Sequence, residues 1–171
     1  VAAGNASRMG GIDKVMAELK GEPMIVRTVR TFQDCDAISE IVIVTRPDLI
    51  QPISKLCRDM PKVKAVVAGG KSRQESVHLG LNTLSDKVKL AAIQDGARPL
   101  ITWQVIDRVV RAANSYGAAI PCVPVKDTIK IGNGGVVQST PDRATLFAAQ
   151  TPQVFDFDLL RGALKKAEQD D

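Results

Sequence analysis

Runs of apolar residues along this chain alternate between two kinds of spacing. The β-branched run at 40–45 places apolar residues on both faces, which is typical of a strand buried on both sides of a parallel sheet, and residues 63–68 predict the next strand. Apolar residues at near-helical spacing predict helices at 23–32 and 47–60. These four segments follow one another in the order helix, strand, helix, strand.

The same alternation continues through most of the chain. The capping box Ser72-Arg73-Gln74-Glu75 predicts the start of another helix. Residues 88–93 and 118–123 predict further strands, with helices at 102–115 and 158–168. We therefore expect a doubly wound α/β fold with a single, mostly parallel sheet, a variant of the Rossmann arrangement. Residues 1–171 are expected to form one domain.

The alternation breaks after Val125. Residues 127–140 predict two short strands joined by Asn133-Gly134-Gly135, which is a strong turn signal. A two-stranded hairpin has little core of its own. We expect residues 126–141 to project as a β-arm that packs on another subunit.

The segment from Ala2 to Lys14 is rich in glycine and small residues and contains two cations, Arg8 and Lys14. Small residues allow backbone N–H groups to approach an anion, and the cations would add full positive charges. The segment matches neither common glycine motif, because Val15 follows Lys14 and Ala6 breaks the Rossmann pattern. Two interpretations stay open for this segment alone, a phosphate-binding loop or a plain glycine-rich turn.

Three segments of this kind each follow a predicted strand, at residues 4–14, 69–76 and 95–99. In doubly wound sheets, ligands bind beyond the carboxyl ends of the strands. The three loops should therefore meet at one edge of the sheet. Their convergence favours a nucleotide site over three unrelated turns.

Charge and composition narrow the class of ligand. The chain has 23 Lys and Arg against 19 Asp and Glu, no basic run, and only 4% aromatic residues. This balance favours an anionic small molecule over a nucleic acid. No signal peptide is visible, and no apolar run reaches the ~20 residues that a membrane span needs.

The three cysteines, Cys35, Cys57 and Cys122, are widely spaced and indicate reduced thiols of a cytoplasmic protein. Val1 leads directly into the glycine-rich segment, so we expect the first strand to begin before it. We likewise expect further chain after Asp171, because no strand follows the last predicted helix.

The motifs, taken in order, resemble those of the 2-C-methyl-D-erythritol 4-phosphate cytidylyltransferase family. They cover nearly the whole chain and are Ala2-Ala3-Gly4, Arg8-Met9-Gly10, Lys14, Gly70, Arg73, Ser76-Val77, Asp95-Gly96-Ala97-Arg98-Pro99, Asp127-Thr128, Asp142-Arg143 and Gln150-Thr151-Pro152-Gln153. The resemblance implies a nucleotidyltransferase of non-mevalonate isoprenoid biosynthesis. In that reaction methylerythritol phosphate attacks the α-phosphorus of CTP, and pyrophosphate leaves. The resemblance also implies a homodimer interlocked by β-arms, and Mg²⁺ or another divalent cation.

The resemblance further assigns roles to individual residues. Arg8, Lys14 and Arg143 match the family's phosphate-binding cations and would act in catalysis. The CTP pocket would be formed by Ala2, Ala3, Gly4, Gly70, Arg73, Ser76, Asp95 and Gly96. Thr128 and Arg143 would reach the sugar phosphate of the neighbouring subunit. Asp95 would hold the metal ion or the ribose.

The chain also departs from the family's pattern. Ala6 stands where Gly is common, Gln94 where His is usual, and Val15-Met16 where Gln and an aromatic residue are usual. The family's second carboxylate and second lysine have no counterpart after Glu168. Two alternative functions stay open, a ribitol-5-phosphate cytidylyltransferase and a nucleotide-binding module without turnover. Ala2-Ala3-Gly4 favours the methylerythritol enzyme, because ribitol relatives more often have Ala-Gly-Gly.

Overall fold

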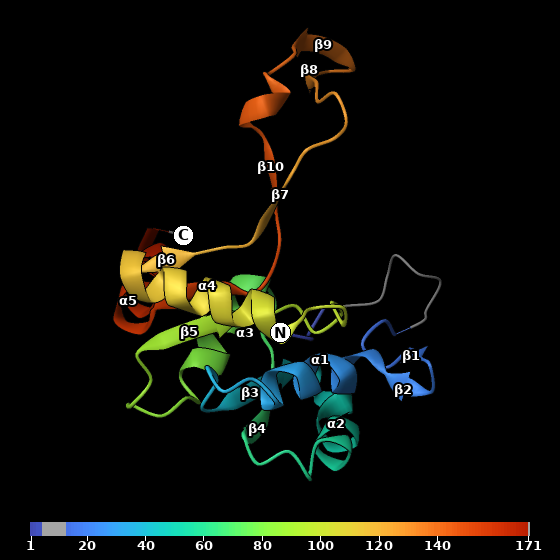
Figure 1. Ribbon diagram of the computed structural model, residues 1–171, viewed down its shortest axis with the longest axis vertical. Helices are drawn as coiled ribbons and strands as arrows, with labels where there is room; N and C mark the ends of the chain where they lie inside the picture. Colours follow the sequence, from blue (N-terminus) through green and yellow to red (C-terminus); the bar gives the residue numbers. More distant parts are fainter. Residues whose placement is uncertain (5–12, 171) are drawn as a thin grey trace.

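The computed structural model of the protein describes residues 1–4 and 13–170. Helices and strands alternate through a body from which a long arm projects (Figure 1). The helices are α1 (Met24–Gln33), α2 (Ile50–Leu56), α3 (Arg73–Leu81), α4 (Trp103–Tyr116) and α5 (Phe157–Asp170), with 3-10 turns η1 (Pro47–Leu49) and η2 (Arg143–Thr145). The strands are β1 (Glu18–Leu19), β2 (Glu22–Pro23), β3 (Ile41–Thr45), β4 (Val63–Ala68), β5 (Leu90–Ile93), β6 (Ala118–Ala119), β7 (Cys122–Pro124), β8 (Ile131–Asn133), β9 (Val136–Ser139), β10 (Phe147–Ala149) and β11 (Gln153–Asp156). The prediction of a mixed α/β fold is confirmed.

The strands of the described residues pair in five separate sheets. β3 and β4 are parallel, whereas the sheet of order β5-β11-β6 is antiparallel throughout. The single, mostly parallel sheet that we predicted is therefore not seen in the strand pairing. One reason is β11, which follows the arm and inserts between β5 and β6. The apolar pattern did not predict this strand.

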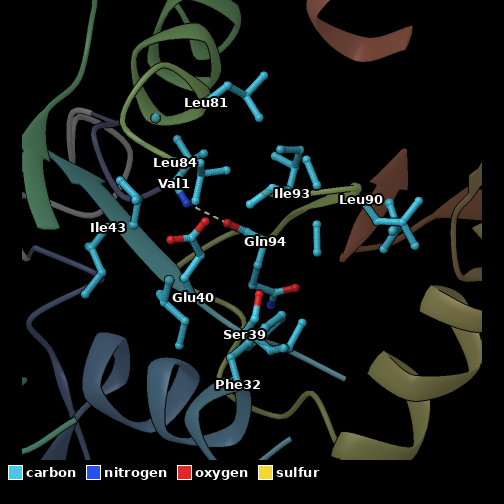
Figure 2. A pocket seen from close by; sticks show the side chains of 18 of the residues that line it. Val1, Phe32, Ser39, Glu40, Ile43, Leu81, Leu84, Leu90, Ile93 and Gln94 are labelled. Carbon is cyan, nitrogen blue, oxygen red and sulfur yellow. Dashed lines mark hydrogen bonds between the residues drawn. The ribbon is translucent and has the colours of Figure 1, made fainter. Parts of the chain in front are cut away.

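The second reason lies between β3 and β5. Ala2 forms a parallel bridge with Thr45 of β3, and the backbone nitrogen of Val1 donates to the carbonyl of Gln94 at 2.6 Å. Beside this link, an apolar cavity of about 440 Å³ lies between the two strands and is also lined by α1 and α3 (Figure 2). Its lining includes residues of both strands, and β3 and β5 do not pair with each other.

Helices cover both faces of these sheets. Successive residues of each strand point to opposite faces, so neighbouring side chains pack on different helices. In β3, Ile43 packs with α1 and α2, whereas Val44 lies against α3. In β5, Ala91 packs with α3 and α5, whereas Ala92 packs with α4. The run at 40–45 was predicted to be buried on both faces, and β3 confirms it, whereas β4 has no fully buried residue and exposes Lys64 and Ala68.

Residues close in sequence define several element boundaries. The N–H of Glu75 donates to Ser72 Oγ at 3.0 Å, as the predicted capping box requires. The carboxylate of Glu75 accepts the N–H of Lys71, one residue before the cap, at 2.6 Å. The predicted strand at 118–123 is divided into β6 and β7 around Pro121, which has no N–H to donate to a neighbouring strand.

The arm begins and ends with the antiparallel pair β7 and β10, and β8 and β9 form its tip (Figure 1). The turn at the tip consists of Gly134 and Gly135, with φ angles of 57° and 79°. Left-handed backbone at both turn positions favours glycine, so the predicted hairpin is confirmed. Several large apolar side chains of the arm are exposed, namely Val123, Ile129, Ile131, Val136, Val137 and Phe147.

In the described part of the chain, no helix has both the length and the apolar character needed to cross a membrane. Cys35 and Cys57 are buried free thiols, and Cys122 is an exposed one. The predicted reduced state of the cysteines agrees with this structure.

Candidate functional site

The loops that follow β4 and β5 meet the start of the chain at one edge of the body. The N–H of Gly69, after β4, donates to the carbonyl of Thr45 at 2.7 Å. A Cβ added to Gly69 would lie 2.3 Å from the Cβ of Ala3, and one added to Gly96 would lie 3.0 Å from the Cβ of Ala2. The convergence that we predicted is confirmed for the described residues. Only small side chains fit at this crossing.

The start of the chain contributes backbone to this edge. Ala2 is buried against β3, Ala3 is half-buried, and Gly4 is exposed. A Cβ added to Gly4 would meet no described atom within 4 Å. Among the described residues, none therefore covers the backbone on the side of Gly4.

Ser76 holds the loop that precedes α3. Its hydroxyl accepts the N–H of Gly70 at 3.1 Å and donates to the carbonyl of Ser72 at 2.9 Å. The side chain is buried, with 2% of its surface exposed. A hydroxyl has one proton and two lone pairs, so one acceptor site stays open after these two bonds.

We predict that Ser76→Ala loosens this loop. The substitution leaves the N–H of Gly70 without its partner, which should cost about 1–2 kcal/mol of unfolding free energy. For a chain of this size the melting temperature should fall by roughly 3–8 °C. Thermal unfolding measures the change, with Ser115→Ala on α4 as a control, since that hydroxyl is exposed. Equal melting temperatures for both variants would contradict the assignment.

Asp95 is the centre of a charged cluster. Its carboxylate accepts Arg73 Nη2 at 3.2 Å and Arg98 Nε at 3.0 Å. Arg73 also donates to Gln153 Oε1 at 3.2 Å, and Arg98 Nη1 donates to Gln150 Oε1 at 2.5 Å. The structure thus brings Asp95 and Arg73 together, as their grouping in one pocket requires.

Gln150 and Gln153 were not among the predicted site residues. Each supports one of the two guanidinium groups that hold Asp95, and Thr151 Oγ1 accepts the N–H of Asp95 at 3.4 Å. The motif Gln150-Thr151-Pro152-Gln153 was recognised in the sequence. Its contacts with the Asp95 cluster could not be predicted, because the motif lies far from Asp95 along the chain. The motif positions the Asp95 loop.

The two arginines lower the pKa of Asp95. Partial burial would raise the pKa of its carboxyl, but the hydrogen bonds from Arg98 and Arg73 outweigh burial and hold that pKa below its ordinary value. Asp95 is therefore ionised at neutral pH. It neutralises part of the positive charge at this edge.

This low pKa predicts a specific pH dependence of stability. A carboxyl whose pKa falls on folding stabilises the fold above its unfolded pKa of about 3.9, and this stabilisation is lost as pH falls through the folded pKa. The melting-temperature difference between the wild type and Asp95→Asn should be constant above about pH 5 and shrink below about pH 4. Thermal unfolding across pH measures it. A difference that persists unchanged in strong acid would contradict this role.

A metal ion would find few protein ligands here. The described residues contain no group of three or more His, Cys, Asp or Glu side chains able to hold a metal. Each oxygen of Asp95 accepts one described N–H and has a second lone-pair site. Asp95 could therefore serve as the single protein ligand of a cation that is held mainly by substrate phosphates and water. Magnesium is commonly bound in this way.

Of the two cations predicted in the glycine-rich segment, Arg8 lies outside the described residues. Lys14 is exposed in a turn that starts at Asp13, where the N–H of Ala17 donates to the carbonyl of Asp13 at 2.8 Å. Arg46, the residue after β3, donates to Asp13 Oδ2 at 2.5 Å. The turn that carries Lys14 is therefore attached at the carboxyl end of β3.

The other predicted substrate residues are on the arm. Arg143 starts η2 and donates from Nη1 to the carbonyl of Lys126 at 2.8 Å, and Thr128 is exposed. Within one chain, the arm extends away from the body (Figure 1). The structure does not bring Thr128 and Arg143 to the loop of Asp95, so the contact implied by the resemblance requires a second copy of the chain.

Comparison with known proteins finds a family that matches the whole chain. The family described as IspD, 2-C-methyl-D-erythritol 4-phosphate cytidylyltransferase, matches residues 1–171. A protein of that name from Symbiobacterium thermophilum is 44% identical over 99% of this chain and 72% of its own length. Another from Geobacillus kaustophilus is 42% identical over 99% of this chain and 75% of its own.

Solved structures agree with this match. The 4-diphosphocytidyl-2C-methyl-D-erythritol synthase of Anaerococcus prevotii has a TM-score of 0.87 and 29% identity, covering 98% of this chain and 72% of that one. The 2-C-methyl-D-erythritol 4-phosphate cytidylyltransferase of Thermus thermophilus has a TM-score of 0.76 and 29% identity, covering 92% and 72%. The mixed α/β fold is shared with both.

Proposed function

Because this chain belongs to the 2-C-methyl-D-erythritol 4-phosphate cytidylyltransferase family, we propose that the loops at the sheet edge bind CTP and hold it for attack by methylerythritol phosphate. An oxygen of the sugar phosphate forms a bond to the α-phosphorus of CTP. The bond from that phosphorus to the leaving pyrophosphate breaks. The products are 4-diphosphocytidyl-2-C-methyl-D-erythritol and pyrophosphate.

One observation carries this proposal, namely the meeting of the Gly4, Gly69 and Asp95 segments at a single edge. Glycine and alanine at the crossing leave room for a ligand beside the backbone. Arg73 adds positive charge next to Asp95, and Lys14 adds it on the turn that Arg46 attaches to the end of β3. Such an edge suits a ligand with a polar base and a polyanionic tail.

The transfer needs no protein nucleophile, because the substrate phosphate is itself the attacking group. Two anions must be aligned, and the charge that develops on the leaving group must be neutralised. We assign Lys14 and Arg8 to the triphosphate. We assign Arg143 to the sugar phosphate, since a guanidinium can donate two parallel N–H bonds to a phosphate.

The CTP pocket in this proposal consists of small residues and backbone. Its members are Ala2, Ala3, Gly4, Gly70, Arg73, Ser76, Asp95 and Gly96. The open acceptor site of Ser76, together with backbone carbonyls, suits the amino group of cytosine, which uracil lacks. The pairing of Arg73 with Asp95 supports their place at the border of this pocket.

Magnesium is the proposed metal, with Asp95 as its candidate protein ligand. When bound, it would neutralise charge on the triphosphate. Arg73 and Arg98 orient the Asp95 carboxylate for binding the magnesium ion.

We propose a homodimer in which the arm, residues 126–141 at its centre, packs on a partner and brings Thr128 and Arg143 to the partner's sugar phosphate. The exposed apolar side chains of the arm support this, because each keeps between 39% and 62% of its surface accessible within one chain. A sedimentation experiment that finds a monomer at working concentrations would contradict the dimer.

Two further assignments belong to the proposal. The bridge of Ala2 to Thr45 and the hydrogen bond from Val1 to Gln94 support one doubly wound sheet, in which the segment of Val1 and Ala2 lies between β3 and β5. We also propose that residues 1–171 form one domain, and the free thiols support a protein that works in the reducing cytoplasm.

The function is tested by pyrophosphate release from the full-length enzyme with magnesium and CTP. Parallel assays contain methylerythritol phosphate, ribitol 5-phosphate or no acceptor. Release that depends on methylerythritol phosphate is the expected result. Faster release with ribitol 5-phosphate would identify the other polyol enzyme, and CTP binding without release would identify a binding module.

A further inference from the structure

We propose that Arg46 is a positioning residue for Lys14, acting through Asp13. This inference rests on the proposed function, because it needs Lys14 to bind the triphosphate. Arg46 directly follows β3 and was not among the predicted site residues. Its signal in the sequence is a cation at the carboxyl end of a buried strand, the end where ligands bind in this class of sheet.

The contacts of Arg46 leave it little freedom. Its Nη2 donates to Asp13 Oδ2 at 2.5 Å and to Asp48 Oδ2 at 3.1 Å, and its Nε donates to Asp48 Oδ1 at 3.2 Å. The side chains of Arg46 and Asp13 are only 22% and 23% exposed. The attraction between two charges that are partly shielded from water is screened less by salt than the attraction between two fully exposed charges. Asp48 therefore orients the guanidinium, and the guanidinium holds Asp13.

Asp13 in turn shapes the backbone around Lys14. Its Oδ1 accepts the N–H of Val15 at 3.1 Å, and its carbonyl accepts the N–H groups of Met16 and Ala17 at 3.2 and 2.8 Å. Val15 is buried, and its carbonyl accepts the N–H of Ile25 at 2.9 Å. Both neighbours of Lys14 are thus held, one by the core and one by Arg46.

The same strand also holds the other end of the glycine-rich segment. The N–H of Ala2 donates to the carbonyl of Val44 at 2.6 Å, and Thr45 Oγ1 donates to the carbonyl of Ala2 at 3.4 Å. Arg46 is the next residue, directly after the end of β3. Three consecutive residues therefore connect to the chain on either side of residues 5–12, which makes the end of β3 the common support for both.

The alternative to this inference is a surface ion pair that contributes only to stability. Arg46→Met tests the difference, because methionine has a similar length but no hydrogen-bond donor. If Arg46 positions Lys14, kcat/KM for CTP should fall about 10-fold, since small displacements of a catalytic group cost one to two orders of magnitude in rate. KM for methylerythritol phosphate should change by less than about two-fold.

Matched variants sharpen the test. Arg46→Lys keeps the charge but cannot bridge two carboxylates with a planar fork, so it should restore part of the lost rate. Asp13→Asn keeps an acceptor for the N–H of Val15, removes the charge that Arg46 binds, and should show the same fall as Arg46→Met. Arg58→Met removes another arginine–aspartate pair, with N···O at 3.4 Å and both side chains more than three-quarters exposed. It should leave the rate unchanged.

The decisive readout is CTP binding in two backgrounds, measured by calorimetry on the full-length enzyme with magnesium. Introduced into the wild type, Arg46→Met should weaken CTP binding. Introduced into the Lys14→Met enzyme, the same substitution should raise the Kd for CTP by less than about two-fold, because Arg46 acts through that lysine. An equal loss in both backgrounds, or no loss in either, would overturn the inference. If Lys14→Met itself leaves turnover intact, the proposed function of Lys14 fails instead.

Discussion

The Lys14→Met enzyme is expected to release pyrophosphate from CTP about 100- to 1000-fold more slowly than the wild type, which is the cost of removing one preorganised charge from a transition state. Lys14 is exposed in a turn that is held by Asp13 and Val15 and attached through Arg46 to the carboxyl end of β3. Methionine preserves the length of the side chain and removes its charge. Because the turn is held by backbone bonds and by Arg46, the fold should survive the substitution.

Steady-state pyrophosphate release with magnesium, CTP and methylerythritol phosphate measures this effect, and thermal unfolding shows whether the variant is folded. Lys55→Met on α2 is a suitable control, since it removes an exposed lysine away from the three loops. Its rate should stay within about two-fold of the wild type. Near-normal turnover by a folded Lys14→Met enzyme would remove this lysine from the phosphate site.

The second large effect is expected from the arm. Arg143→Ala should lower turnover about 100-fold or more, because it removes a charged donor from the sugar phosphate. The distinctive expectation concerns mixtures. In our proposal, Arg143 serves the site of the partner, whereas Lys14 serves the site of its own chain. A heterodimer of Arg143→Ala and Lys14→Met therefore contains one site with both substitutions and one intact site.

Equal amounts of the two inactive variants, refolded together or co-expressed, should thus regain activity. Half of the dimers are mixed and each has one of two sites intact, so about a quarter of wild-type turnover is expected. Each variant mixed with itself is the control and should stay inactive. If the mixture also stays inactive although mixed dimers form, Arg143 does not act across the dimer.

Much of the local structure was readable from residues a few positions apart. The capping bond between Glu75 and Ser72, the two-residue glycine turn of the arm and the burial of β3 on both faces all follow from short patterns. These features depend on local backbone preference and on the alternation of side chains along a strand. The ordered motifs were also enough to suggest the family, which the match over residues 1–171 confirms.

Contacts between distant residues were not readable in this way. Arg73 meets Gln153 80 positions later, Arg46 meets Asp13 33 positions earlier, and β11 inserts antiparallel between β5 and β6. Neither hydrophobic period nor local propensity specifies such pairings, because they arise only when separate elements pack together and leave particular donors and acceptors facing each other. Pattern alone thus predicted a mixed α/β fold with loops converging at one edge, and the ordered motifs suggested the family, whereas packing selected the strand order and the partners that hold Asp95 and the turn of Lys14 in place.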